Sequence, residues 1–165
     1  MTKWLALSAV IVALDQATKF VVTQRFTLGS VVEVTPFLNL VLVYNPGAAF
    51  SFLSDGGGWQ RGLFIAIAVI ASVWIVYLLR RYSHQRLFAL ALALVLAGAL
   101  GNLIDRILIG AVIDFVDVHA FGFHWPAFNV ADSAITCGAV LLVWDALRPR
   151  KTQIPGPQIN ADKRR

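Results

Sequence analysis

The stretch GLFIAIAVIASVWIVYLL, at residues 62–79, holds no charged side chain, and LFALALALVLAGALGNLI, at residues 87–104, is equally free of charge. As an α-helix, each run would extend about 27 Å at 1.5 Å per residue, close to the thickness of the hydrocarbon core of a bilayer. The short link between them carries Arg80, Arg81 and Arg86. These features predict two membrane-spanning helices joined by a basic turn.

Two further apolar stretches, one near each end of the chain, are interrupted by charge. The first contains Asp15 and Lys19, and the last contains Asp132 and Asp145. The first could be a secretory signal, but Asp15 lies where its apolar region should continue and no small-x-small cleavage site follows. We therefore expect it to be retained as a span. The predicted spans cover about residues 4–22, 60–79, 87–106 and 130–147 of a single membrane domain at residues 1–150.

The composition indicates that lipid is the solvent for much of the surface. Of the 165 residues, 58% are hydrophobic and 14% are charged, whereas soluble domains are roughly one quarter charged. A soluble fold would need many more polar side chains to cover its core. The predicted fold class is therefore a mainly α membrane protein, a bundle of four transmembrane helices.

The basic residues predict the orientation of this bundle. The net charge of +5 reflects Lys3, the arginines between the second and third spans, and a basic segment after Leu147. The positive-inside rule places these groups, and so both termini, in the cytoplasm. Because this clustering accounts for the charge, we expect no nucleic-acid partner. Residues 151–165, with two prolines and a glycine, are predicted to be a disordered cytoplasmic tail.

The two connections on the outer side differ in character. Residues 26–58 are too many for a turn, and segments 31–34 and 37–44 are rich in β-branched and aromatic residues. They predict two short strands of a small extracytoplasmic β-sheet. Residues 56–58 are all glycine, which predicts a flexible joint that would let the sheet act as a mobile lid. Residues 107–128 are interpreted as a second outer loop.

Five aspartates gather in or near the outer half of the predicted bundle: Asp15, Asp105, Asp114, Asp117 and Asp132. Ionisable groups at membrane depth are costly, so they are site candidates by default. Several also have a structural interpretation. Asp15 and Lys19, four apart on one helix face, would pair and snorkel. Asp105 fits an interfacial ion network, and Asp117 fits a solvated loop carboxylate.

Asp132 has the strongest structural alternative. It follows Asn129 by three positions at the start of the last span, which is the spacing of a capping box. Cap and catalyst are equally compatible with this pattern. His119 and His124 have a spacing compatible with metal ligands, but no matching third or fourth ligand accompanies them, so we expect no metal and no cofactor.

Five short motifs carry a more specific signal. They are Leu14-Asp15-Gln16 with Thr18-Lys19, Tyr44-Asn45-Pro46-Gly47-Ala48-Ala49-Phe50, Gly101-Asn102-Leu103-Ile104-Asp105-Arg106, Val112-Ile113-Asp114-Phe115 and Phe128-Asn129-Val130-Ala131-Asp132-Ser133. With these motifs in this order, the sequence resembles the bacterial lipoprotein signal peptidases, also called signal peptidase II. Pro46 is a slight departure, since a threonine or another small polar residue is also familiar there.

The resemblance implies a membrane aspartic endopeptidase of the bacterial cytoplasmic (inner) membrane. Such enzymes remove signal peptides from prolipoproteins, cutting before the cysteine that carries a diacylglyceryl group. By resemblance, Asp114 and Asp132 form the catalytic dyad on the outer side of the membrane. The supporting residues implied are Asp15, Asn45, Asn102, Arg106 and Asn129. The family is inhibited by the cyclic peptide globomycin, and we expect this protein to act as a monomer beside membrane lipid.

The chemistry agrees with that implication. Amide hydrolysis needs an activated water and a proton for the departing amine, and two neighbouring carboxyl groups that share one proton supply both. A helix N-terminus favours the ionised form of Asp132, which would leave the proton on Asp114. A proton-coupled transporter or a non-catalytic scaffold remains the alternative. A transporter would space its acids through the full membrane depth, whereas here they concentrate on one side.

Overall fold

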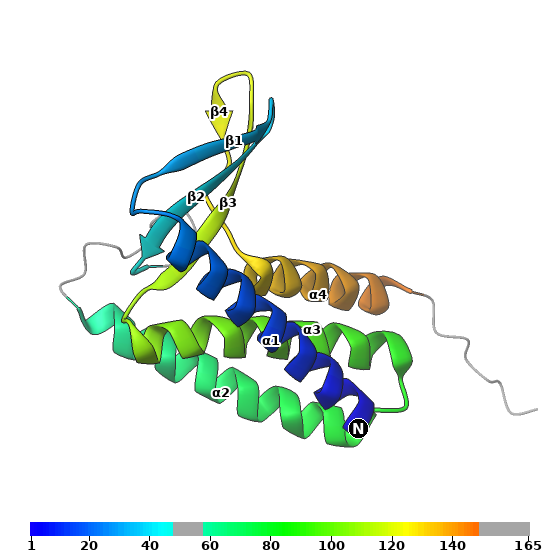
Figure 1. Ribbon diagram of the computed structural model, residues 1–165. Coiled ribbons are helices and arrows are strands. Elements are labelled where there is room, and N and C mark those ends of the chain that lie inside the picture. The colour runs from blue at the N-terminus through cyan, green and yellow to red at the C-terminus, as the bar shows by residue number, and fades with distance from the viewer. Residues whose placement is uncertain (48–57, 149–165) are drawn as a thin grey trace, which may run out of the picture.

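The computed structural model describes residues 1–47 and 58–148, where four long helices support a small sheet at one end (Figure 1). The helices are α1 (Thr2–Arg25), α2 (Trp59–Tyr82), α3 (Arg86–Leu108) and α4 (Val130–Leu147). All four are long and apolar enough to cross a membrane. The predicted fold class, four transmembrane helices with a small sheet, is confirmed. The predicted tail at 151–165 and most of the glycine joint lie outside the described residues.

The first three helices run past the predicted spans. The helix α1 continues to Arg25 and α3 to Leu108, beyond the apolar runs that mark the membrane core. Hydropathy reports the length immersed in lipid, whereas backbone hydrogen bonds carry a helix on into the polar interface. Outward-facing side chains such as Ile70 and Val140 are mostly exposed. In water such faces would be unfavourable, so they agree with lipid contact.

Close packing of α3 against α4 depends on glycine. A Cβ added at Gly101 on α3 would lie 3.1 Å from Cβ of Ala131 on α4, and one added at Gly138 on α4 would lie 2.7 Å from Cγ2 of Val95 on α3. Small residues allow backbones to approach where lipid provides no hydrophobic force between helices. This interface brings the start of α4 against the outer part of α3.

The sheet has four antiparallel strands in the order β1-β2-β3-β4. They are β1 (Val31–Thr35), β2 (Leu38–Asn45), β3 (Val112–Ala120) and β4 (Phe123–His124). The interpretation of residues 107–128 as a loop is therefore wrong, because residues 112–118 of β3 pair with β2 and residues 119–120 pair with β4. The aspartates that suggested a loop find partners within the sheet. Asp117, for example, accepts a hydrogen bond from Asn39 on β2 at 2.9 Å.

The sheet lies at the end of the bundle where α1 and α3 end and α2 and α4 begin (Figure 1). A small core of Val22, Leu42, Ile113 and Phe115 joins α1 to the inner strands. The backbone N–H groups of Phe115 and Val116 both donate to the carbonyl of Phe128, just before α4. These bonds fix the start of β3 beside the start of α4.

Candidate active site

A cavity of about 780 Å³ opens between α2, α3, α4 and the start of β3. Five of the seven predicted site residues line it: Asn45, Asn102, Arg106, Asp114 and Asp132. The other two, Asp15 and Asn129, are fully buried behind the cavity wall. The remainder of the lining is mainly apolar. The cavity thus joins a polar end to an apolar wall.

Asp132 occupies the first turn of α4 and caps that helix. Its Oδ2 accepts the N–H of Asn129 at 3.3 Å, while Oδ1 of Asn129 accepts the N–H of Asp132 at 2.9 Å. The other carboxylate oxygen, Oδ1, accepts from Nδ2 of Asn102 at 2.8 Å, and Asp132 is one of the residues that line the cavity. The predicted capping box is present. The cap engages Oδ2, whereas Oδ1 accepts from a side chain that also lines the cavity, so capping does not exclude a chemical role.

Asp114 approaches from the sheet. It is 2% exposed and accepts hydrogen bonds from Nδ2 of Asn129 at 2.8 Å and from Nδ2 of Asn45 at 3.1 Å. Burial, with the nearby charge of Asp132, raises the pKa of Asp114 to about 7, although the two amides and Lys19 act in the opposite direction. Near neutral pH this carboxyl is therefore partly protonated.

Asn129 connects the two carboxyl groups. Its Nδ2 donates to Asp114, and the same nitrogen lies 3.3 Å from Oδ1 of Asn102 and 3.2 Å from the carbonyl oxygen of Ile113. The same side chain caps α4 through Asp132. One amide therefore sets the position of both aspartates.

Arg106 and Asn45 secure the turn that follows β2. The Nη2 of Arg106 donates to the carbonyl of Gly47 at 2.8 Å, and Oδ1 of Asn45 accepts the N–H of Gly47 at 3.0 Å. The guanidinium also lies 4.9 Å from the centre of the Phe64 ring on α2. These contacts tie α3 to the turn that carries the Asn45 amide to Asp114.

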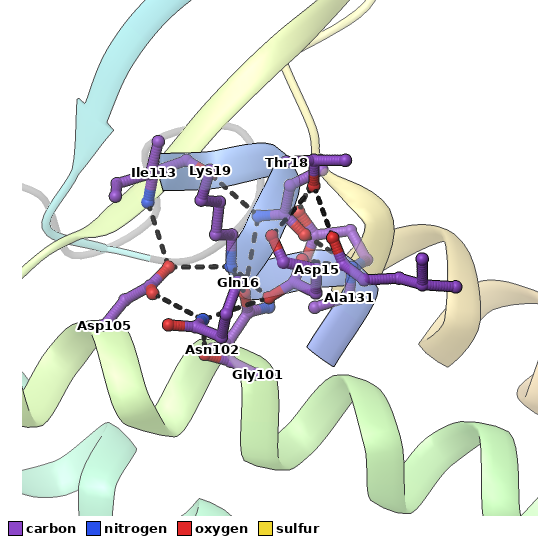
Figure 2. A network of polar contacts seen from close by, with 12 residues as sticks. Asp15, Gln16, Thr18, Lys19, Gly101, Asn102, Asp105, Ile113 and Ala131 are labelled. Atoms are coloured by element: carbon purple, nitrogen blue, oxygen red, sulfur yellow. Dashed lines mark hydrogen bonds and ion pairs between the residues drawn. The ribbon is translucent and has the colours of Figure 1, made fainter. Parts of the chain in front are cut away.

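Behind the cavity lies a buried ion cluster, formed by Asp15, Lys19 and Asp105 (Figure 2). The predicted pairing of Asp15 with Lys19 is present at 2.8 Å. Snorkelling was the wrong expectation, because Asp105 supplies a second carboxylate at 2.7 Å and Lys19 is 1% exposed. The ion network expected for Asp105 is accordingly buried rather than interfacial. Gln16 also bridges the two carboxylates.

Asp117 does not join the cavity lining. It lies on β3 with Nδ1 of His124 at 3.0 Å, and the rings of His119 and His124 stack with centroids 4.9 Å apart. Burial alone would raise the pKa of Asp117, but hydrogen bonds from Asn39 and His124 outweigh it and hold that pKa below its ordinary value. The expectation of a solvated loop carboxylate is wrong. Asp117 is a structural group of the sheet.

Asp105 was among the candidate carboxylates, but the pairing of Lys19 with Asp105 beside the dyad was not predicted from the sequence. A signal was available, since Lys19 is the one cation in the apolar part of its span and two acids lie at a similar depth. A buried ammonium needs such acids as partners. What could not be seen was that α1 and α3 cross at this point.

The comparisons with known proteins agree with this arrangement. Residues 7–148 match the family described as Signal peptidase (SPase) II. The lipoprotein signal peptidase of Burkholderia thailandensis is 55% identical over 148 residues, covering 90% of this chain and 89% of that protein. A lipoprotein signal peptidase from Janthinobacterium sp. is 57% identical and covers 90% of each.

Solved structures agree as well. A bacterial membrane enzyme determined at 2.3 Å resolution superposes with a TM-score of 0.81 at 33% identity, covering 93% of this chain and 95% of that one. A second, at 1.9 Å resolution, has a TM-score of 0.79 at 34% identity, with 91% and 96% covered. Motifs, fold and similarity over 90% of the chain lead to one conclusion: this multi-pass membrane protein belongs to the signal peptidase II family of peptidases.

Proposed function

We propose that this protein is an aspartic endopeptidase that removes signal peptides from diacylglyceryl-modified prolipoproteins, cutting before the lipidated cysteine. The observation that carries the proposal is the convergence of Asp114 and Asp132 on one cavity, bridged by Asn129. Family membership supports the substrate class, since the relatives are lipoprotein signal peptidases.

The unequal surroundings of the two carboxyl groups suggest their roles. Asp132, at a helix N-terminus with Asn102 donating to it, is the charged partner and takes a proton from the attacking water. Asp114, whose pKa is about 7, donates a hydrogen bond to the scissile carbonyl oxygen. The water oxygen bonds to the carbonyl carbon. As the C–N bond breaks, the departing amine takes up a proton from the dyad, and one proton remains shared.

The shape of the cavity fits a substrate that stays partly in lipid. Its wall includes Ile67, Ala68 and Ala71 from α2 and Ile135 from α4, while the polar end holds the dyad. Acyl chains would lie against the apolar side as the peptide bond reaches the carboxyl groups. We place a globomycin-type inhibitor in the same cavity and a monomer as the working unit. A globomycin-type peptide that left cleavage unchanged would contradict this placement, and crosslinked dimers in lipid would contradict the monomer.

We also place the dyad on the outer side of the bacterial inner membrane. Arg80, Arg81 and Arg86 lie at the end of the bundle opposite the sheet (Figure 1), and the positive-inside rule favours the cytoplasm for that end. Both termini then lie in the cytoplasm.

The test uses purified full-length protein and a prolipoprotein carrying a diacylglyceryl cysteine, with the products identified by mass. We expect a cut before the lipidated cysteine, and we expect Asp114→Asn and Asp132→Asn each to lower kcat by about a thousandfold or more. Asp117→Asn, on the same strand, and Asp145→Asn, on the same helix, are matched controls expected to remain active. The proposal fails if wild type makes no cut or if either dyad variant cleaves normally.

A further inference from the structure

The ammonium group of Lys19 has all of its hydrogen-bonding capacity in use. Its Nζ lies 2.8 Å from Oδ2 of Asp15, 2.7 Å from Oδ2 of Asp105 and 3.1 Å from Oδ1 of Asn102. An ammonium has three hydrogens to donate, so these three acceptors account for them. Because α1 supplies one acceptor and α3 the other two, the cation fixes the crossing of these helices (Figure 2).

Each carboxylate partner of Lys19 also holds the backbone beside one dyad residue. Oδ1 of Asp15 accepts the N–H of Ala131 at 2.8 Å, one position before Asp132. Oδ2 of Asp105 accepts the N–H of Ile113 at 3.3 Å, one position before Asp114. The cluster therefore touches both segments that deliver the dyad, although none of its members lines the cavity.

The third partner, Asn102, connects the cation to a dyad carboxylate directly. Its Oδ1 accepts from Lys19, and its Nδ2 donates to Oδ1 of Asp132 at 2.8 Å. A flipped amide would place its NH₂ group against the ammonium, with donor facing donor, and its oxygen against the carboxylate. Nδ2 of Asn129 also donates to Oδ1 of Asn102, at 3.3 Å. The charge of Lys19 therefore reinforces the orientation in which the NH₂ group of Asn102 faces Asp132.

Charge adds to this geometry. The groups around Lys19 and the dyad are Asp15 on α1, Asp105 and Arg106 on α3, Asp114 on β3 and Asp132 on α4. Two buried carboxylates beside one ammonium leave a net negative charge behind the cavity. The positive charge of Lys19 also favours ionisation of Asp114.

We propose that Lys19 is a positioning residue for the dyad: its ammonium orients Asn102 toward Asp132 and, with Asp15 and Asp105, aligns the backbones that present both carboxyl groups. This inference deepens the proposed function and rests on it for its catalytic consequence. Lys19 does not touch the substrate. It acts through Asn102 and through the hydrogen bonds at Ala131 and Ile113.

Three variants of the full-length protein test the inference. Lys19→Met keeps an unbranched side chain that is one atom shorter and removes the ammonium. Lys3→Met removes the same charge from an exposed position on the same helix and is the matched control. The double variant Lys19→Met/Asp105→Asn removes one positive and one negative charge, so the net buried charge is unchanged. If Lys19 only neutralises the buried acids, this variant should fold like wild type.

With lipidated prolipoprotein as substrate, we expect Lys19→Met to lower kcat by about thirtyfold or more while KM changes by less than about threefold, as for a group that acts on the transition state. We expect the double variant to unfold at a temperature near wild type yet remain slow, because Asn102 is still without its cation. Recovery of kcat in the double variant would show that Lys19 only balances the charge of the buried carboxylates, and would overturn the inference. Wild-type kcat in folded Lys19→Met would overturn it too.

A second readout needs no substrate. The carboxyl stretch of Asp114, identified by its loss in Asp114→Asn, can be titrated by infrared difference spectroscopy. We expect its midpoint to move to higher pH in Lys19→Met and to stay in place in Lys3→Met. An unmoved midpoint in Lys19→Met overturns the inference whatever the cleavage result. A moved midpoint together with uncut substrate in wild type overturns the proposed function and supports the placement of Lys19.

Discussion

Asp114 and Asp132 line one cavity but have unequal surroundings. Asp132 accepts hydrogen bonds from its own helix cap and from Asn102, whereas Asp114 lies on a strand, 2% exposed, with two amide donors. A pair of this kind divides its roles, with one group holding the proton and the other the charge. The two titrate as a coupled pair, so kinetic pKa values describe the pair rather than either residue alone.

The raised pKa of Asp114 predicts the alkaline side of the pH–rate profile. Because that pKa is about 7, the protonated form is lost as the pH rises through neutrality. We expect kcat/KM of wild type to fall tenfold per pH unit well above this value. The measurement is cleavage of lipidated prolipoprotein at constant ionic strength. A flat profile from pH 6 to 9 would contradict the assignment of the proton to Asp114.

The same carboxyl predicts how stability varies with pH. Its folded-state pKa of about 7 exceeds the ordinary value of 3.8, so its contribution is fully present below the unfolded value and is lost as pH rises through the folded one. The full shift corresponds to about 4 kcal/mol in order of magnitude. We expect the unfolding temperature of wild type to fall between about pH 4 and pH 7 more steeply than that of Asp114→Asn. Parallel curves would show that Asp114 is ionised throughout.

Among the secondary-structure elements, the α1–α3–α4 contact is the one on which the site depends. A Cβ at Gly101 would lie 2.6 Å from Oδ2 of Asp15 and 3.1 Å from Cβ of Ala131. We expect Gly101→Ala to displace Asp15 from the N–H of Ala131, with a loss of about 1–3 kcal/mol in stability and at least tenfold in kcat. Gly62→Ala on α2 is the control, since its Cβ would meet nothing within 4 Å. Equal activity and stability of the two variants would contradict this packing account.

Helices were easier to predict than strands here. An uncharged run such as residues 62–79 has one favourable environment, so its helix could be predicted from the sequence alone. The strand at 112–120 was missed because its two aspartates resemble loop residues until their partners across the sheet are known. Asn39 and His124 are such partners for Asp117. The roles of Lys19 and Asp105 depend on how helices cross, and one sequence does not reveal that crossing.

For the whole molecule, the polar residues of the site collect at one end of an apolar bundle. The sheet caps that end, and the arginines of the α2–α3 link lie at the other (Figure 1). This polarity separates the account from a proton-relay transporter, which would place acids through the full membrane depth. It also agrees with a substrate whose acyl chains remain in the bilayer.

Orientation can be tested by labelling single cysteines in intact cells with a membrane-impermeant maleimide. In a Cys137→Ala background, we expect Phe121→Cys, at the exposed β3–β4 turn, to react from outside. We expect His84→Cys, in the exposed α2–α3 link, to react only after the membrane is opened. The reverse pattern would place the dyad on the cytoplasmic side.

The central claim is that Asp114 and Asp132 together carry out the cut. Its most direct measurement is the single-turnover rate of signal-peptide release from lipidated prolipoprotein, with substrate binding measured in parallel. We predict that Asp114→Asn and Asp132→Asn bind the substrate within about threefold of wild type but release the signal peptide at a rate lower by about a thousandfold or more. Release by either variant at a rate close to that of wild type would contradict the claim.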